Sequence, residues 1–303
     1  MESSAHGTGG NAIVALLLWL TLAGMLSVYL VAAVRQRRLA RGWSGWRIAS
    51  FVAGIVMLAL AVSPPLTALA HHDLRGHMVH HLLLGMLAPL ALVLAAPVTL
   101  ALRTLPVHAG RRVSALLRSR PLHVIAHPVT ALVLNVGGMY LFYLTPLYAA
   151  TLTSPLLHGL VHLHFLAAGY LFAWAIAGPD PSPRRPGMRT RLAVLFIAMA
   201  AHSTLAKLMY AYAWPRGTPH GLDQIRAAAQ LMYYGGDLAE LLLAIALFAT
   251  WYRASGRRYE RLRSLRASGE VVTATPARYA SHTYTRMRRG GVRNRTPPEE
   301  MGL

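Results

Sequence analysis

One short stretch of the chain, residues 70–84, is dominated by histidine and reads AHHDLRGHMVHHLLL. Five histidines fall within eleven residues there: His71, His72, His77, His80 and His81. On a helix that begins near Gly76, His77 and His81 are four residues apart and share one face, with His80 beside them. Two imidazoles on one helix face offer two nitrogen donors to a metal ion or a haem. The stretch therefore predicts half of a binding site, which other parts of the chain must complete.

The same spacing occurs again at His158 and His162. Two helices that each carry such a pair at one depth could place four imidazoles opposite one another. Histidines near a membrane surface also hydrogen-bond headgroups or helix ends, so a purely structural role stays open. His123 and His127 form a third pair beside Pro128, and there a polar entry to a helix is the simpler interpretation.

Deeper polar residues extend the candidate site. His202 lies far inside an apolar stretch, and Asp237 and Glu240 are three residues apart on one helix face. Ionisable groups at such depth are costly and normally face a protein interior or water. They could form structural ion pairs, with Lys207 as one partner, or a relay for protons or metal. The candidate metal ligands are His77, His81, His158, His162, His202, Asp237 and Glu240.

The chain has no cysteine, which excludes disulfides, zinc ribbons and thiolate copper sites. Any metal must therefore be held by His, Met, Asp, Glu or other oxygen and nitrogen donors, and a haem held by histidine is the alternative. Met78 lies between the histidines, and its thioether suits Cu(I). No phosphate-binding loop, nucleophile elbow or HExxH motif occurs, so we do not expect an enzyme.

The composition indicates an integral membrane protein. The 303 residues are 55% hydrophobic and only 13% charged, whereas soluble domains carry roughly a quarter charged residues. Apolar residues group into seven blocks near bilayer length, and the third block contains Pro89 and Pro97, where a kink or an early end is expected. The predicted spans are 12–34, 48–69, 77–102, 122–144, 157–177, 191–213 and 225–251.

The distribution of Lys and Arg predicts the orientation of these spans. Most of the 30 basic residues lie in alternate connections, 35–47, 103–121, 178–190 and the tail from Arg253. The other connections hold only Arg75 and Arg216, so the positive-inside rule places the N-terminus outside and the C-terminus in the cytoplasm. The net charge of +20 is thus explained by topology, and nucleic acid is not an expected partner.

We expect an all-α fold in three parts. An outer N-terminal tail (1–11) precedes a seven-helix membrane domain (12–252), and a basic, disordered cytoplasmic tail (253–303) follows. In the tail, residues 257–263 could extend the last helix along the membrane surface.

Four stretches of the membrane domain carry a resemblance to a known family. They are residues 77–84 with the following Ala88-Pro89 and 96–98, the segment 144–148, the segments 157–165, 169–174 and 178–180, and His202 with Asp223-Gln224 and residues 230–240. The chain resembles the CtaG-type cytochrome c oxidase assembly factors, bacterial seven-helix proteins associated with caa-type haem–copper oxidases. The family more often has glutamine where this chain has His80, so the resemblance implies no ligand role there.

The resemblance implies a role in maturing the oxidase, with copper delivered or inserted at the outer side of the bacterial cell membrane. Expected partners are oxidase subunits, an extracytoplasmic copper donor and the lipid bilayer. The residues leave three alternatives: a haem-binding redox protein, a metal or proton transporter, and a scaffold that binds no metal.

Overall fold

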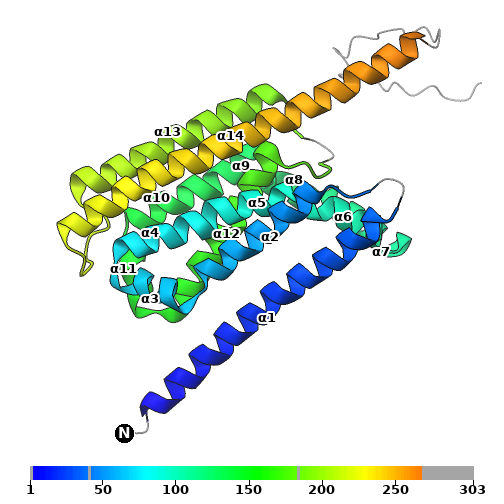
Figure 1. The fold of residues 1–303 in the computed structure, drawn as a ribbon. Helices are drawn as coiled ribbons and strands as arrows, with labels where there is room; N and C mark the ends of the chain where they lie inside the picture. The colour runs from blue at the N-terminus through cyan, green and yellow to red at the C-terminus, as the bar shows by residue number, and fades with distance from the viewer. Residues whose placement is uncertain (1–2, 40–41, 183–184, 268–303) are drawn as a thin grey trace, which may run out of the picture. The chain divides into compact units, whose positions relative to one another are not determined.

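The computed structural model describes residues 3–39, 42–182 and 185–267 (Figure 1), and all regular structure in this part of the chain is helical. The prediction of an all-α fold is therefore confirmed. The elements are α1 (Ser3–Arg37), α2 (Gly45–Ala61), α3 (Pro64–His72), α4 (Leu74–Leu82), η1 (Leu83–Leu87), α5 (Ala88–Leu94), α6 (Pro97–Thr104), α7 (Val107–Leu117), α8 (Arg120–Ile125), α9 (Pro128–Leu132), η2 (Val133–Gly137), α10 (Gly138–Tyr143), α11 (Leu147–Thr153), α12 (Pro155–Ala177), α13 (Met188–Tyr212) and α14 (Leu222–Ala267).

Five helical segments in the described residues are long and apolar enough to cross a membrane, or up to seven if each of two bent pairs forms one span. The five are Ile13–Arg37, Leu74–Leu94, Pro155–Ala177, Met188–Tyr212 and Leu222–Gly256. The bent pairs are Gly45–Ala61 with Pro64–Ala70, at 56°, and Pro128–Tyr143 with Leu147–Thr153, at 74°. Each bend falls at a Pro-containing junction, where a missing N–H and a fixed φ interrupt a helix.

The third predicted span ends earlier than residue 102. Its continuous part is α4, the π-helical turn η1 and α5, which together run from Leu74 to Leu94. Ala96 then adopts a left-handed conformation, with φ of 54°, and α6 starts a separate helix at Pro97. The residue before a proline is pushed out of the right-handed helical region, which explains this break.

A close backbone approach joins η1 to α12. Pro89 has no N–H to donate to the carbonyl of Gly85, four residues earlier. That carbonyl lies against Gly169 of α12, where a Cβ would overlap both its carbon and its oxygen. The contact is possible only because Gly169 has no side chain. It sets the distance between the helix that carries His77 and the helix that carries His162.

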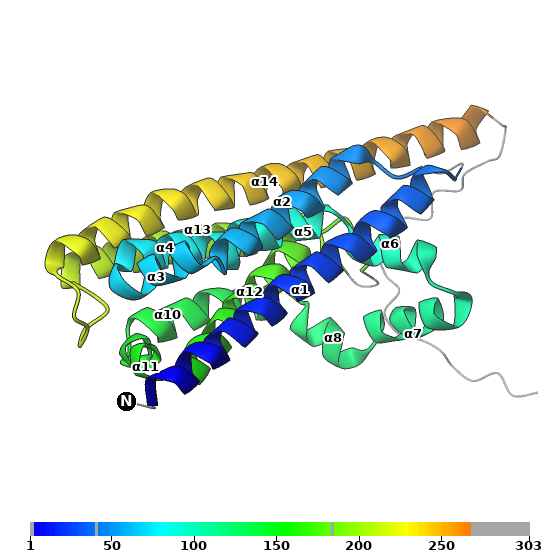
Figure 2. The same ribbon diagram turned by 60° about the horizontal axis from the view of Figure 1, so that its bottom comes forward.

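The long helices α13 and α14 run side by side in both views (Figures 1 and 2), and ion-pair, hydrogen-bond and cation–π contacts between side chains join them. On the other side of the bundle, α1 packs on α2 and α6. There the Tyr29 ring stacks on Phe51 with 3.8 Å between centroids, and its hydroxyl donates to the Ala95 carbonyl.

The predicted basic connection 103–121 is largely helical. It contains α7, which has no buried residue, and the start of α8. A short helix with basic and apolar faces beside the spans is typical of a segment that lies in the membrane interface.

The loop after α12 is tied to α6 by Asp180, which is only 1% exposed. Its carboxylate accepts hydrogen bonds from the backbone N–H groups of Val98 and Thr99 and from the Thr99 hydroxyl. A carboxylate in this position satisfies the free N–H groups at the start of α6. The Gly178-Pro179-Asp180 segment therefore has a structural role that its sequence alone does not indicate.

Contacts group the residues up to Gly256 into one compact unit, and residues from Arg257 into another. In the second unit α14 remains helical to Ala267, so the basic segment 257–263 does extend the last helix. The disordered tail predicted beyond it lies outside the described residues. At the other end α1 begins at Ser3, within the predicted N-terminal tail.

Candidate functional site

Four histidines from two helices come together in one cluster, which we call the outer cluster after the side on which the sequence predicts it. His77 and His80 lie on α4, and His158 and His162 lie on α12. The His162 ring is the centre: its centroid lies 6.0 Å from His77, 4.4 Å from His80 and 4.1 Å from His158. The two helices predicted to share a site are thus in contact through their imidazoles.

A hydrogen bond fixes the tautomer of His162. Its Nδ1 lies 2.8 Å from the carbonyl oxygen of His158, one turn earlier on α12. A carbonyl can only accept, so Nδ1 carries the proton and donates it. In a neutral His162, Nε2 is then the nitrogen that carries the lone pair, and it is the atom through which this ring would bind a metal ion. Metal-binding histidines are commonly oriented in this way by a bond from their other nitrogen.

His77 lies in an aromatic enclosure and is 3% exposed. Its ring meets Tyr148 edge-on at 5.1 Å and lies 5.7 Å from Phe142 and 6.1 Å from Tyr143. The His77 Nε2 atom is buried and has no hydrogen-bond partner. Buried polar atoms are nearly always paired, so an unpaired ring nitrogen beside another imidazole is a candidate ligand atom.

The Met78 thioether, suggested by the sequence as a ligand for Cu(I), is already engaged in the protein core. It is fully buried, and its sulfur accepts a hydrogen bond from the Tyr143 hydroxyl at 3.7 Å.

A second polar group lies deeper, between α13 and α14. The fully buried His202 has its Nδ1 3.7 Å from a carboxylate oxygen of Glu240, which is 4% exposed. Gly236 makes room for this imidazole, because a Cβ there would overlap the His202 ring. Neither ring nitrogen of His202 has a hydrogen-bond partner, nor does the other Glu240 oxygen.

Asp237 and Lys207 do not pair as one interpretation suggested. The Asp237 carboxylate accepts a hydrogen bond from the Ser203 hydroxyl at 3.2 Å, which joins α13 to α14. The Lys207 ammonium instead lies 5.4 Å from the centroid of the Tyr233 ring, a cation–π contact. The proposed ion pair is therefore absent from the described residues.

His81 lies between the two groups. It is 3% exposed, packs edge-on against Phe165 at 4.9 Å and has both ring nitrogens buried without a partner. It interacts electrostatically with both His162 and His202. The seven candidate ligands thus form two groups. The outer group lies on α4 and α12, the deeper group lies on α13 and α14, and His81 lies between them.

No set of three or more His, Asp or Glu side chains in the described part of the chain is arranged to hold a metal ion. The imidazoles are neighbours, but their nitrogens do not converge on one point. A metal would therefore need side-chain rotation to gather its ligands.

Two further residues were not predicted from the sequence. Tyr148 packs on His77 and also joins its hydroxyl to the His220 ring, 3.0 Å away in the α13–α14 connection. His164 donates to the Leu134 carbonyl in η2, a contact that requires Gly138, where a Cβ would overlap the ring. The sequence signal for Tyr148 was its place in the segment 144–148, and for His164 its place beside His162. Among the other outer histidines, His72 is exposed at the end of α3.

Sequence comparison gives the decisive observation. Residues 27–254 match the model of the cytochrome c oxidase caa3 assembly factor family, Caa3_CtaG. The chain belongs to this family. The match covers both histidine groups and all five long helices, at least in part, so the resemblance noted in the sequence is confirmed.

Similar proteins occur in mycobacteria. An uncharacterized protein of Mycobacterium bovis is 37% identical over 179 residues, which cover 57% of this chain and 27% of that protein. An uncharacterized protein of Mycobacterium leprae is 31% identical over 247 residues, which cover 76% of this chain and 38% of that protein. The chain therefore spans well under half the length of these relatives. No solved structure matches it.

Proposed function

We propose that this caa3 assembly factor receives copper at the outer histidine cluster and passes it to a cytochrome c oxidase subunit. The observation that carries the proposal is the approach of the His77 and His162 rings, with the His77 Nε2 unpaired and the His162 tautomer fixed by its Nδ1 bond. Imidazole nitrogen is a good ligand for copper and permits exchange without thiolates.

The distances in the cluster suit one shared ion. With metal–nitrogen bonds of about 2 Å, an ion lies about 3 Å from the centroid of each imidazole that binds it. Two ligands of one ion therefore have centroids no more than about 6 Å apart. The 6.0 Å between His77 and His162 and the 4.4 Å between His80 and His162 fall in this range. Ring rotation about χ2 is then the movement that gathers the nitrogens.

The deeper group completes the proposed path. His81 connects the outer cluster to His202 and Glu240, whose unpaired atoms supply a second place for the cargo or for its displaced proton. This order, from outer imidazoles inward, fits a relay that holds copper in successive sites of similar chemistry.

The proposal includes the membrane arrangement. Each bent helix pair forms one span, which gives seven spans, with the histidine cluster on the outer side of the bacterial cell membrane. There an extracytoplasmic copper donor and an oxidase subunit could both reach α4 and α12. The role is one of assembly and involves no catalysed reaction.

Copper binding to the purified protein tests the site. Addition of copper to the wild type should give stoichiometric binding, measured by competition with a chromophoric chelator. The double variant His77→Ala/His162→Ala should bind at least about tenfold more weakly, because two nitrogen donors are lost. His108→Ala is the matched control, since His108 is exposed on α7 and outside the cluster.

The outcome also separates the alternatives. Wild type that binds no copper, or equal binding by all three proteins, contradicts the proposed site. A Soret band in the absorption spectrum of the purified protein would instead identify a haem protein. In cells, reduced copper in the oxidase of the double variant, with normal copper in the His108→Ala strain, would support delivery as the function.

A further inference from the structure

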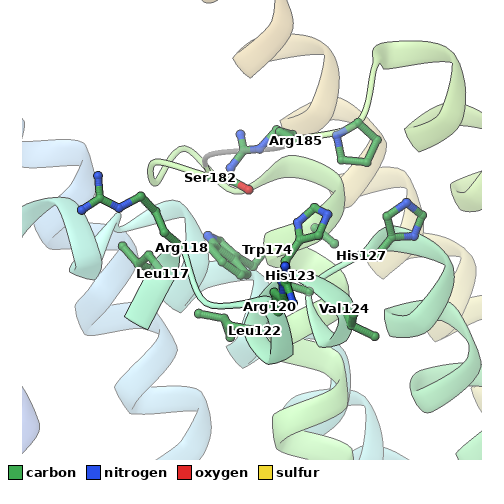
Figure 3. Close-up of a pocket in the computed structure, with 13 residues that line it drawn as sticks. Leu117, Arg118, Arg120, Leu122, His123, Val124, His127, Trp174, Ser182 and Arg185 are labelled. Carbon is green, nitrogen blue, oxygen red and sulfur yellow. The ribbon is translucent and has the colours of Figure 1, made fainter. Parts of the chain in front are cut away.

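A cavity of about 520 Å³ lies at the opposite, basic end of the chain's helices from the histidine cluster. The end of α7, α8, the end of α12 and the loop before α13 surround it (Figure 3). Three arginines and two histidines line it together with Trp174: Arg118, Arg120, Arg185, His123 and His127. Among the described residues that line it, none is acidic.

Trp174 lines this cavity with its indole ring. Its side chain is only 7% exposed, and its indole Nε1 is buried without a partner. An indole nitrogen can only donate, and a buried donor is nearly always paired with an acceptor. Because this Nε1 is closed off from solvent, Trp174 contributes ring surface rather than a donor to the cavity wall.

His127 supplies an N–H donor among the lining residues. Its Nδ1 accepts the backbone N–H of Val129 at the start of α9, at 3.3 Å. When one nitrogen of a neutral imidazole accepts, the other carries the proton. The Nε2 of His127 is therefore an N–H donor, so the polar groups of this cavity offer donors and no anionic acceptor.

Arg185 adds a positive charge whose position is fixed. One of its terminal nitrogens donates to the Asp180 backbone carbonyl at 2.7 Å. The guanidinium has five N–H donors, so others can bind a ligand. Burial and the neighbouring Arg191 charge lower the pKa of the Arg185 guanidinium. Positive charges that crowd one another in this way are stabilised by an anion.

We propose that this cavity binds the phosphate of an anionic phospholipid headgroup, with Arg118, His127 and Arg185 as its donors. Bidentate N–H groups of arginine suit phosphate oxygens, and a basic cavity between helices at a membrane border is where an anionic headgroup can enter. The volume lies in the range of small-ligand sites. The apolar lining, Leu117, Leu122 and Val124, suits the adjoining acyl chains.

Lipid retention and lipid-dependent stability test this site. The full chain is placed in phosphatidylcholine nanodiscs with and without cardiolipin, and its melting temperature and its bound lipids by native mass spectrometry are measured. Cardiolipin should raise the melting temperature of the wild type and remain bound. Arg185→Gln and Arg118→Gln should each weaken cardiolipin binding by about tenfold, the loss expected for one charge-assisted contact.

Arg111→Gln is the matched control, because Arg111 is exposed on α7 and does not line the cavity. Binding equal to that of the wild type in this control, with loss in Arg118→Gln, supports a defined site. Equal loss in all three arginine variants would mean diffuse attraction and would overturn the proposal. Inorganic phosphate that stabilises the protein in phosphatidylcholine as much as cardiolipin does would identify a free phosphate site and also overturn the lipid assignment. Arg118 is exposed, so its variant keeps the test valid if Arg185→Gln does not fold.

Discussion

Gly236 decides where the imidazole of His202 can lie. The ring occupies the space in which any Cβ on Gly236 would sit, and it is enclosed on all sides. A side chain this confined cannot rotate away, because protein interiors have few voids. The absence of one methyl group in α14 therefore positions a candidate ligand on α13.

We expect Gly236→Ala to lower the free energy of unfolding by about 1–3 kcal/mol, the usual cost of overpacking a core. The measurement is thermal or denaturant unfolding in detergent. Gly256→Ala on the same helix is the control, since nothing lies within 4 Å of a Cβ there. The double variant Gly236→Ala/His202→Ala should recover part of the loss, because it removes the ring that the methyl group strikes. No recovery would contradict this account of Gly236.

The types of the candidate ligands could be predicted from the sequence, but their grouping could not. The spacing of His77 and His81 places both on one face, yet in the structure His77 lies beside His162 and His81 also approaches His202. This division depends on the rotation of each helix and on its shift along its neighbour. The position of His80 in the chain likewise does not predict that its ring centroid lies 4.4 Å from that of His162.

At the scale of helices, the crossing of η1 and α12 holds the two halves of the outer cluster at their distance. Gly169 lies directly against the Gly85 carbonyl, and backbone cannot move aside as a flexible side chain would. Small residues at such crossings allow helices in membranes to approach closely. His77 and His162 lie on the two segments that this contact joins.

We expect Gly169→Ala to separate these helices and to affect both stability and copper binding. The free energy of unfolding should fall by about 1–3 kcal/mol or more, and copper affinity should fall by about tenfold or more because the imidazoles move apart. The measurements are unfolding in detergent and copper competition. Gly159→Ala on the same helix meets nothing within 4 Å and should leave both quantities unchanged. Stable Gly169→Ala protein with normal copper binding would contradict a role for this crossing.

The apolar blocks in the sequence predicted every long helix, because length and composition determine which segments can cross a bilayer. The bends of 56° and 74° were not predicted. A proline marks a break but does not give its angle, which is set by packing against other helices. The helix α7 was missed for a related reason: its basic residues were counted as a connection, although its apolar residues lie on one face of a helix.

At the scale of the whole molecule, the orientation in the membrane decides whether the histidine cluster can meet an external donor. The proposed arrangement has alternate connections on each side, with Lys and Arg concentrated on the cytoplasmic one. The α13–α14 connection, which carries His220 beside Tyr148, would then face outward with the cluster. The α7 region would lie inside with the basic cavity.

Single cysteines test this arrangement without background, because the chain has none of its own. Pro219→Cys places a thiol in the exposed α13–α14 connection, and Arg111→Cys places one on exposed α7. A membrane-impermeant maleimide is added to cells whose cytoplasmic membrane is intact and whose outer face the reagent can reach. It should label Pro219→Cys and leave Arg111→Cys unlabelled. Permeabilised cells should label both, which shows that each thiol is reactive. Labelling of Arg111→Cys alone in intact cells would invert the topology. It would place the histidine cluster on the cytoplasmic side, where delivery from an external copper donor is impossible.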